Sequence, residues 1–139
     1  MMPLRVDGKI TAERETIPVG SGEVTAHHCT GHSPGSLVYT AKLGEQTVLF
    51  GQDVHGPLHP SLLSNRSQYL KSLKFLLSLE VDILCEGHFG VFRGRENVKH
   101  FIRQYFHIFI DYNMFSYTNI GKLSVVLETP IFARDSQSV

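Results

Sequence analysis

Several features that would narrow the class of this protein are scarce or absent. Only two of its 139 residues are cysteine, so a disulfide framework is not indicated and a reduced, cytoplasmic compartment is expected. Lys plus Arg and Asp plus Glu number 13 each, and this balance offers no electrostatic basis for binding nucleic acid or a membrane surface. The longest apolar stretch, around 106–110, is far too short to span a bilayer, and no secretory signal is visible.

The composition that remains is that of a globular domain. Hydrophobic residues make up 42% of the chain and charged residues 19%, and the length is enough for one domain with a real core. Eight histidines are many for this length. Three of them, together with one cysteine, crowd into the segment "HHCTGH" at 27–32. Histidine and cysteine are metal-binding side chains, so this segment is the first to explain.

The pattern of strands and turns changes to one of helices along the chain. Short strands are expected at 11–19, 23–29, 36–43 and 47–50, separated by Gly- and Pro-containing turns, which favours a partly antiparallel sheet. Apolar spacing predicts a helix over 65–80, capped by Ser64 or Ser67, and another over 98–112, with a short buried strand at 81–85 between them. A further strand is predicted at 122–128. The fold class predicted is α+β, with a mixed, mostly antiparallel sheet and two helices.

Three strand ends share one arrangement, in which a glycine and a potential metal ligand follow an apolar strand. The ligands are His32 in "CTGH", Asp53 in "LFGQD" and His88 in "CEGH". Glycine at a strand end allows a sharp turn and a close approach to a neighbour or an ion. Strand ends of one sheet can meet at one rim, and two imidazoles with a carboxylate suit Zn²⁺, and also Fe or Mn.

These three segments, in this order, resemble the metallo-β-lactamase fold superfamily of metal-dependent hydrolases. "CTGHSPGS" resembles its "TPGHTPGS" segment, "LFGQD" its "GD" segment and "CEGHFG" its late "GH" segment. The resemblance implies that His32 is a ligand of a first metal, Asp53 the bridge between two metals and His88 a ligand of a second. The family signature H-x-H-x-D-H, which supplies most of the remaining ligands, is absent from this sequence.

The resemblance also implies an architecture. The family fold is an αββα sandwich of two sheets, and this chain would be its C-terminal half over residues 1–112, with 113–139 as a tail. A half sandwich leaves the inner face of its sheet uncovered. We therefore expect a homodimer, a missing N-terminal half or the tail to cover that face.

Two functions remain open. The first is a metal-dependent hydrolase of a small-molecule substrate, in which a metal-activated water attacks the scissile bond. The complete fold holds up to two ions, whereas His32, Asp53 and His88 alone would hold at most one. The second is a non-catalytic remnant or interaction module that retains half of the fold.

The other potential ligands are given lesser roles. His55 and His59, close to Asp53 in the sequence, are expected to be loop residues, with a role in the pocket or as a replacement ligand as the alternative. Adjacent residues of a strand point to opposite faces, so at most one of His27 and His28 could face the site, and a surface position is expected for both. His100 and His107 are expected to be solvated on a helix. Cys29 and Cys85, each three residues before a key histidine, allow a Cys₂His₂ zinc site as a further alternative.

Overall fold

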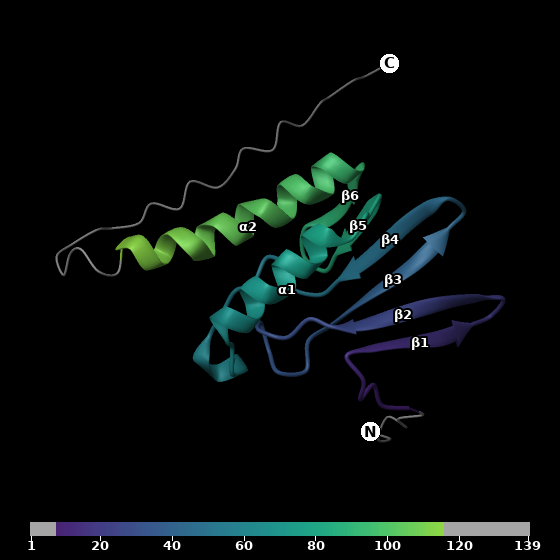
Figure 1. The fold of residues 1–139 in the computed structure, drawn as a ribbon, viewed down its shortest axis with the longest axis horizontal. Helices are drawn as coiled ribbons and strands as arrows, with labels where there is room; N and C mark the ends of the chain where they lie inside the picture. Colours follow the sequence, from purple (N-terminus) through teal and green to yellow (C-terminus); the bar gives the residue numbers. More distant parts are fainter. Residues whose placement is uncertain (1–7, 116–139) are drawn as a thin grey trace, which may run out of the picture.

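The computed structural model describes residues 8–115, with side chains up to residue 108, and has the α+β class predicted (Figure 1). Its elements follow in the order β1 (Arg14–Val19), β2 (Gly22–His28), β3 (Leu37–Leu43), β4 (Gln46–Gly51), η1 (Pro60–Leu62), α1 (Arg66–Ser78), β5 (Ile83–Glu86), β6 (Gly90–Arg93) and α2 (Arg95–Phe115). The element η1 is a single turn of 3-10 helix. Neither described α-helix combines the length and the apolar character that crossing a membrane requires.

The strands form one six-stranded sheet in the order of the chain, β1-β2-β3-β4-β5-β6. All neighbouring pairs are antiparallel except β4 and β5, which are parallel. A parallel pair needs a long crossover connection, and the segment containing α1 provides it. As a result β2, β4 and β5 all run in the same direction. The loops that follow these three strands therefore leave the sheet at the same end, the one where these strands finish, which we call the rim.

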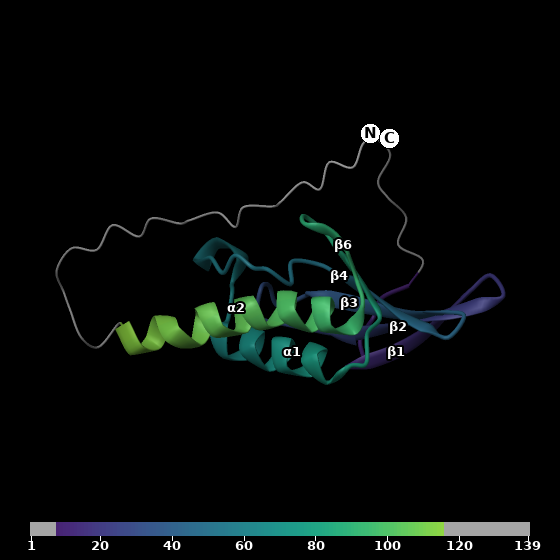
Figure 2. The same ribbon diagram turned by 90° about the horizontal axis from the view of Figure 1, so that it is seen from above.

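Both helices cover one face of the sheet, as Figure 2 shows from above. Along β4 and β5, Leu49 and Leu84 point toward the helices and are fully buried. Helix α1 contributes Tyr69, Leu73 and Leu76 to this core. Helix α2 contributes Val98, Phe101 and Ile102. Burial of these side chains between the sheet and the two helices is the main source of stability, because apolar surface removed from water contributes about 25 cal/mol per Å².

The opposite face of the sheet also carries apolar side chains. The strand register places Tyr39, Phe50, Cys85 and Val91 opposite one another in a single row. Phe50 is 46% exposed and Val91 54% exposed. Neither described helix lies on this side (Figure 2). The expectation that a second copy of the chain or another half of the fold covers it stays a prediction.

The boundaries of several elements differ from those predicted. The cap of α1 is Asn65, not Ser64 or Ser67, and its side chain accepts a hydrogen bond from the backbone N–H of Gln68. Helix α2 begins three residues before the predicted start, and it continues into the predicted tail as far as Phe115. Strand β6 was not predicted at all, because its four residues follow β5 after only a tight turn. The strand predicted at 122–128 lies outside the described residues.

Candidate metal centre

The rim brings together the three residues singled out from the sequence. His32 follows β2, Asp53 follows β4 and His88 follows β5, and these are the three strands that end at the same edge. Nε2 of His32 lies 3.4 Å from Oδ2 of Asp53. Nε2 of His88 lies 2.9 Å from Oδ1 of the same carboxylate. Asp53 thus stands between two imidazoles, one facing each of its oxygens. The role of these residues as ligands stays a prediction.

A close contact with α1 sets the position of His32. Gly31 has a φ of +128°, a conformation that side-chain-bearing residues rarely adopt, and a Cβ there would lie 2.1 Å from the backbone nitrogen of Tyr69. Only glycine lets the chain after β2 pass this close to the first turn of α1. The carbonyl of Gly31 also accepts a hydrogen bond of 2.7 Å from the N–H of Asn65, the cap residue. This contact ties His32 to the start of the helix.

The ring of His32 is held in one tautomer. Its Nδ1 lies 2.8 Å from the carbonyl oxygen of Pro57, and a carbonyl can only accept, so Nδ1 carries the proton. In the neutral ring Nε2 then presents its lone pair to the carboxylate of Asp53. Two electron-rich atoms 3.4 Å apart repel one another unless a cation, either a proton or a metal ion, lies between them.

The backbone at Asp53 is unusual. Asp53 has a φ of +51° and is one of two non-glycine residues with positive φ in the described chain. Asp tolerates this conformation better than most residues, at a cost of about 1 kcal/mol or more. The turn after β4 is thus made by Asp53 itself, not by the glycine at the strand end, since Gly51 keeps an ordinary φ. Such strain is found at functional sites, where the surrounding structure maintains it.

A buried carboxylate, Glu86, lies directly behind the rim. It accepts hydrogen bonds from Nδ1 of His55 at 2.8 Å and from the backbone N–H groups of His88 and Phe89 at 2.7 and 2.9 Å. Burial alone would raise the pKa of Glu86, but the hydrogen bonds from His55 and from the two backbone amides outweigh it and lower that pKa. Glu86 is therefore ionised at neutral pH. Sequence reasoning missed this residue, although it stands inside the "CEGH" segment.

His55 joins the cluster at the rim. Asp53, His55 and His88 each offer a ligand atom, and these atoms lie within 4.8 Å of one another. The ring of His55 meets the ring of His88 edge-on with centroids 4.9 Å apart, and it packs in the same way on Phe89. Expected mainly as a loop residue, His55 is in fact part of the candidate site. The only sequence signal for this role was that His55 stands two residues after Asp53, in "DVH".

The remaining histidines and the cysteines lie elsewhere. His59 is exposed in the loop before η1, and its ring binds Ser61. The surface position predicted for His27 is wrong, because its side chain turns toward α1 and is buried against Phe75. Burial also raises the pKa of Cys29 to about 12, despite a hydrogen bond from Ser72 that lowers it. The Cys₂His₂ alternative is not supported by the geometry, because Cys29 lies in the core beneath the helices whereas Cys85 lies on the opposite face of the sheet.

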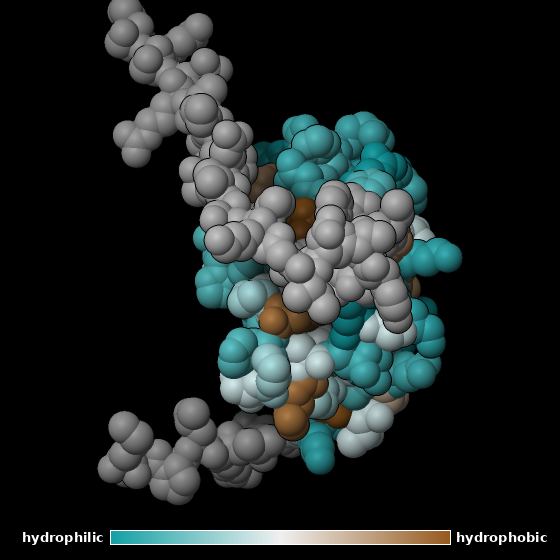
Figure 3. All heavy atoms as spheres, turned by 90° about the vertical axis from the view of Figure 1, so that its left-hand side faces the viewer, coloured by the Kyte–Doolittle hydropathy of each residue, from teal (hydrophilic) through white to brown (hydrophobic). Residues whose placement is uncertain are grey.

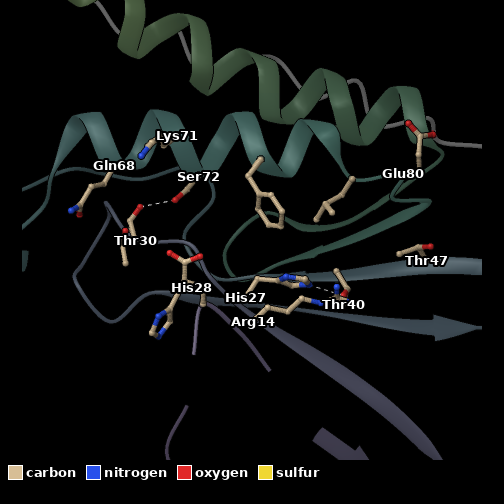
Figure 4. A pocket seen from close by; sticks show the side chains of 13 residues that line it. Arg14, His27, His28, Thr30, Thr40, Thr47, Gln68, Lys71, Ser72 and Glu80 are labelled. Carbon is tan, nitrogen blue, oxygen red and sulfur yellow. Dashed lines mark hydrogen bonds between the residues drawn. The ribbon is translucent and has the colours of Figure 1, made fainter. Parts of the chain in front are cut away.

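His27 lies in a groove of about 850 Å³ between α1 and strands β1 to β4 (Figure 4). Its Nε2 forms a hydrogen bond of 2.9 Å with the hydroxyl of Thr40, and in Figure 4 the two side chains point toward one another while His28 points away. Burial, and after it the positive charge of Arg14, lower the pKa of His27. This histidine is therefore neutral at pH 7.

Comparisons with known proteins identify the fold. No family model matches the sequence, and no curated protein matches it either. Among solved structures, the MIM-2 metallo-β-lactamase is 17% identical, with a TM-score of 0.59 over 79% of this chain and 48% of that chain. A metallo-β-lactamase from Cronobacter sakazakii is 15% identical, with a TM-score of 0.61 over 84% of this chain and 54% of that one. An archaeal metallo-β-lactamase superfamily protein from Sulfolobus tokodaii is 14% identical, with a TM-score of 0.52 over 84% and 42%.

The chain thus has the metallo-β-lactamase fold, which confirms the resemblance inferred from the three rim segments at the level of the fold. It spans about half the length of the solved structures that it matches.

Proposed function

We propose that this chain carries metal-binding residues of a metal-dependent hydrolase, with His32, Asp53 and His88 holding a Zn²⁺, Fe or Mn ion at the rim. The ligand types fit such an ion, because imidazole nitrogens and carboxylate oxygens are the donors that these metals take in proteins. No thiolate is needed. The substrate we expect is a small molecule, and the compartment is the cytosol, where the two free cysteines stay reduced.

One observation carries the proposal, namely the position of Asp53 between two imidazoles. In the neutral ring of His32, Nδ1 keeps its proton and donates it in a hydrogen bond to the carbonyl of Pro57, which leaves Nε2 unprotonated. That lone pair nevertheless points at a carboxylate oxygen. A cation at this place removes the repulsion, and it gives a reason for the positive φ of Asp53.

The site also has the exposure that catalysis needs. The side chains of His32 and Asp53 are each 14% exposed, which shields them from bulk water, whereas that of His88 is 63% exposed. A substrate can therefore approach from the side of His88. A bound ion of this kind lowers the pKa of a water ligand toward about 7 and polarises a carbonyl or phosphoryl oxygen. In hydrolysis the hydroxyl of water joins the carbonyl carbon or phosphorus, the bond to the leaving group breaks, and the water proton goes to that group.

The classes of substrate to test come from the fold and from the chemistry of an activated water. Figure 3 views the molecule from the left-hand side of Figure 1, and the hydrophobic residues visible there form separate patches between hydrophilic ones. The solved structures above are named metallo-β-lactamases, so a β-lactam is one class to test. Esters and phosphodiesters are the other classes, because the same attack by activated water cleaves them.

The test measures metal content and hydrolysis on the purified 139-residue chain. Zn, Fe and Mn per chain are quantified by elemental analysis, before and after incubation with Zn²⁺. Turnover is then followed with a chromogenic β-lactam, a nitrophenyl ester and a bis-nitrophenyl phosphodiester. We expect close to one metal per chain, and turnover of at least one substrate that both a chelator and Asp53→Ala abolish.

The matched control is Glu45→Ala, which removes an exposed carboxylate from the turn between β3 and β4, at the other end of β4 from Asp53. It should change neither metal content nor turnover. If the wild-type chain takes up no metal and cleaves none of the substrates, the hydrolase proposal fails. The protein would then be a non-catalytic module that keeps the fold.

A further inference from the structure

We propose that His55 is a metal ligand at the rim and that Glu86 is the residue that positions it. This inference rests on the proposed function and deepens it by adding a ligand that the three resembling segments do not contain. In this refinement the second imidazole of the ion comes from His55 in place of His32, which stays beside the other oxygen of Asp53.

The first argument is proximity. Within the described residues, the group whose ligand atoms converge within 4.8 Å is Asp53, His55 and His88. His32 lies 3.4 Å from Asp53 but does not belong to this group. His55 comes from the same turn as Asp53, two residues later, and its ring lies edge-on against that of His88. One ion could therefore be reached by ligands from the loops after β4 and β5.

The second argument is the protonation of the His55 ring. Glu86 is a carboxylate and accepts hydrogen bonds, so the 2.8 Å contact places a proton on Nδ1 of His55. Nε2 is then the nitrogen with a free lone pair. Metal-binding histidines nearly always donate their other ring N–H to a carboxylate or a carbonyl, which fixes the tautomer and makes the ligating nitrogen more basic. His55 has this arrangement with Glu86.

The third argument is that Glu86 is costly to bury and serves two loops at once. Its side chain is fully buried, and burying a charge is unfavourable unless it is well paired. Besides His55, it accepts the backbone N–H groups of His88 and Phe89. One carboxylate therefore sets the ring of one proposed ligand and the backbone of another. A residue needed only for packing would not require a charge at this place.

The arrangement has a chemical consequence. Two imidazoles and one carboxylate are a common ligand set for catalytic zinc, with a fourth position left open for water or substrate. His55 does not come from the segments that a search for the family pattern would use, and Glu86, although it stands in the "CEGH" segment, is not the ligand expected there. The site would therefore bind one ion without ligands from any other polypeptide.

The experiment is a competitive Zn²⁺ titration of the full chain against a chromophoric chelator, in wild type, His55→Gln, Glu86→Gln and His59→Gln. We expect His55→Gln to weaken binding by about 100-fold or more and Glu86→Gln by roughly 10- to 100-fold, the range seen when a residue that orients a metal ligand is replaced. His59→Gln is the matched control from the same loop and should leave affinity unchanged. Thermal melting of the metal-free variants verifies that each one folds.

A second measurement reports on the ring itself and does not depend on affinity. Long-range ¹H–¹⁵N NMR of the histidine rings should show the Nδ1–H tautomer for His55 in the metal-free wild type, and Zn²⁺ should shift its Nε2 resonance. In Glu86→Gln the neutral tautomers should mix. A merely structural role for Glu86 would not change this equilibrium.

The outcomes separate the two proposals. If wild type binds Zn²⁺ and His55→Gln binds it equally well, with Nε2 of His55 unmoved, this inference is wrong while the hydrolase proposal stands. If wild type and all variants bind no metal, both are wrong. If Glu86→Gln alone fails to fold, His55→Gln and the wild-type NMR spectrum still decide the question.

Discussion

The molecule contains histidines in two places, the rim and the groove, and the charge of their neighbours differs between the two. At the rim, His32, His55 and His88 each lie against a carboxylate. In the groove beside α1, the described interactions of the His27 side chain are with the hydroxyl of Thr40 and the ring of Phe75, and none of them places a carboxylate against its nitrogens. The rim favours a bound cation, whereas the groove favours a neutral ring.

The difference shows that proximity in the sequence is a poor guide to the role of a histidine. His27 is five residues from His32 and lies on the same stretch of chain, yet strand β2 ends between them. The first belongs to the face of the sheet beneath α1, and the second to the rim. Four expected outcomes test this contrast, from the largest effect to the smallest.

The largest effect is expected from Gly31→Ala, which would disrupt the rim while leaving the groove side chains in place. The new Cβ would lie 2.1 Å from the backbone nitrogen of Tyr69, and the alanine would have to keep the backbone φ of +128° that Gly31 has. Strain and overpacking together should cost on the order of 3 kcal/mol of unfolding free energy. Urea denaturation measures this loss.

Gly35→Ala is the matched control, because a Cβ at Gly35 meets nothing within 4 Å. It should unfold at the same urea concentration as wild type. Equal stability of Gly31→Ala and Gly35→Ala would show that the chain after β2 does not pass α1 as closely as described.

The second effect is stabilisation of the rim by metal. An ion that binds only the folded state adds about 2.7 kcal/mol when present at 100 times its Kd, which corresponds to roughly 10 °C or more in Tm for a domain of this size. We expect Zn²⁺ to raise the Tm of wild type and a chelator to reverse the rise, whereas Asp53→Ala should show no response. Differential scanning calorimetry gives both values. A response that persists in Asp53→Ala would place the ion elsewhere.

The third effect is a pH dependence of the unfolding free energy, which arises from His27 in the groove. The pKa of His27 is lowered from its ordinary 6.5 in the folded state, so the unfolded chain binds a proton there more readily. The contribution of His27 to stability is therefore complete above pH 6.5 and is lost as the pH falls through and below that value. Denaturation between pH 5 and pH 8, in the presence of a chelator, should show lower stability on the acid side.

Comparison with His27→Gln isolates this contribution from that of the other histidines. Glutamine can keep the hydrogen bond to Thr40 but cannot take up a proton. The variant should lose less stability than wild type on acidification. Parallel curves for the two proteins would mean that His27 titrates equally in the folded and unfolded states.

The smallest effect is expected for metal binding by that same variant. His27→Gln changes the groove alone, so its Zn²⁺ affinity at pH 7 should equal that of wild type in the competitive titration. Its unfolding free energy should fall by about 1 kcal/mol, because the variant loses the packing of the His27 ring on Phe75. A loss of metal affinity would mean that groove and rim are coupled through β2.

Much of the fold and part of the site could be predicted from the sequence. Short apolar runs bounded by turn residues located the strands β1 to β5, and helical spacing located α1 and α2, because both patterns are local. The three strand ends pointed to His32, Asp53 and His88, and the structure places these residues together. Strand β6 and the cap at Asn65 were missed, because four residues carry little periodicity and several polar residues near the helix start could serve as a cap.

The contributions of Glu86, His55 and His27 could not be predicted, because they depend on contacts between distant segments. Glu86 and His55 are 31 residues apart, and His27 and Phe75 belong to a strand and a helix that come together only in the folded chain. Nothing in the local pattern around Glu86 distinguishes it from a solvated glutamate. Its carboxylate gains its specific hydrogen-bond partners only in the folded chain, where β5 lies beside β4 and the loop that follows it.

The sequence by itself determined the class of the protein, the order of its elements and the ligand types that follow three of its strands, since these depend on residue spacing and on the chemistry of single side chains. Only the tertiary structure decided which histidines face a carboxylate and which are buried against a helix. The reason is the direction of the strands. β2 and β4 run the same way because the antiparallel β3 lies between them, and β5 joins them because α1 carries the chain back over one face of the sheet, which brings three separate strand ends to one rim.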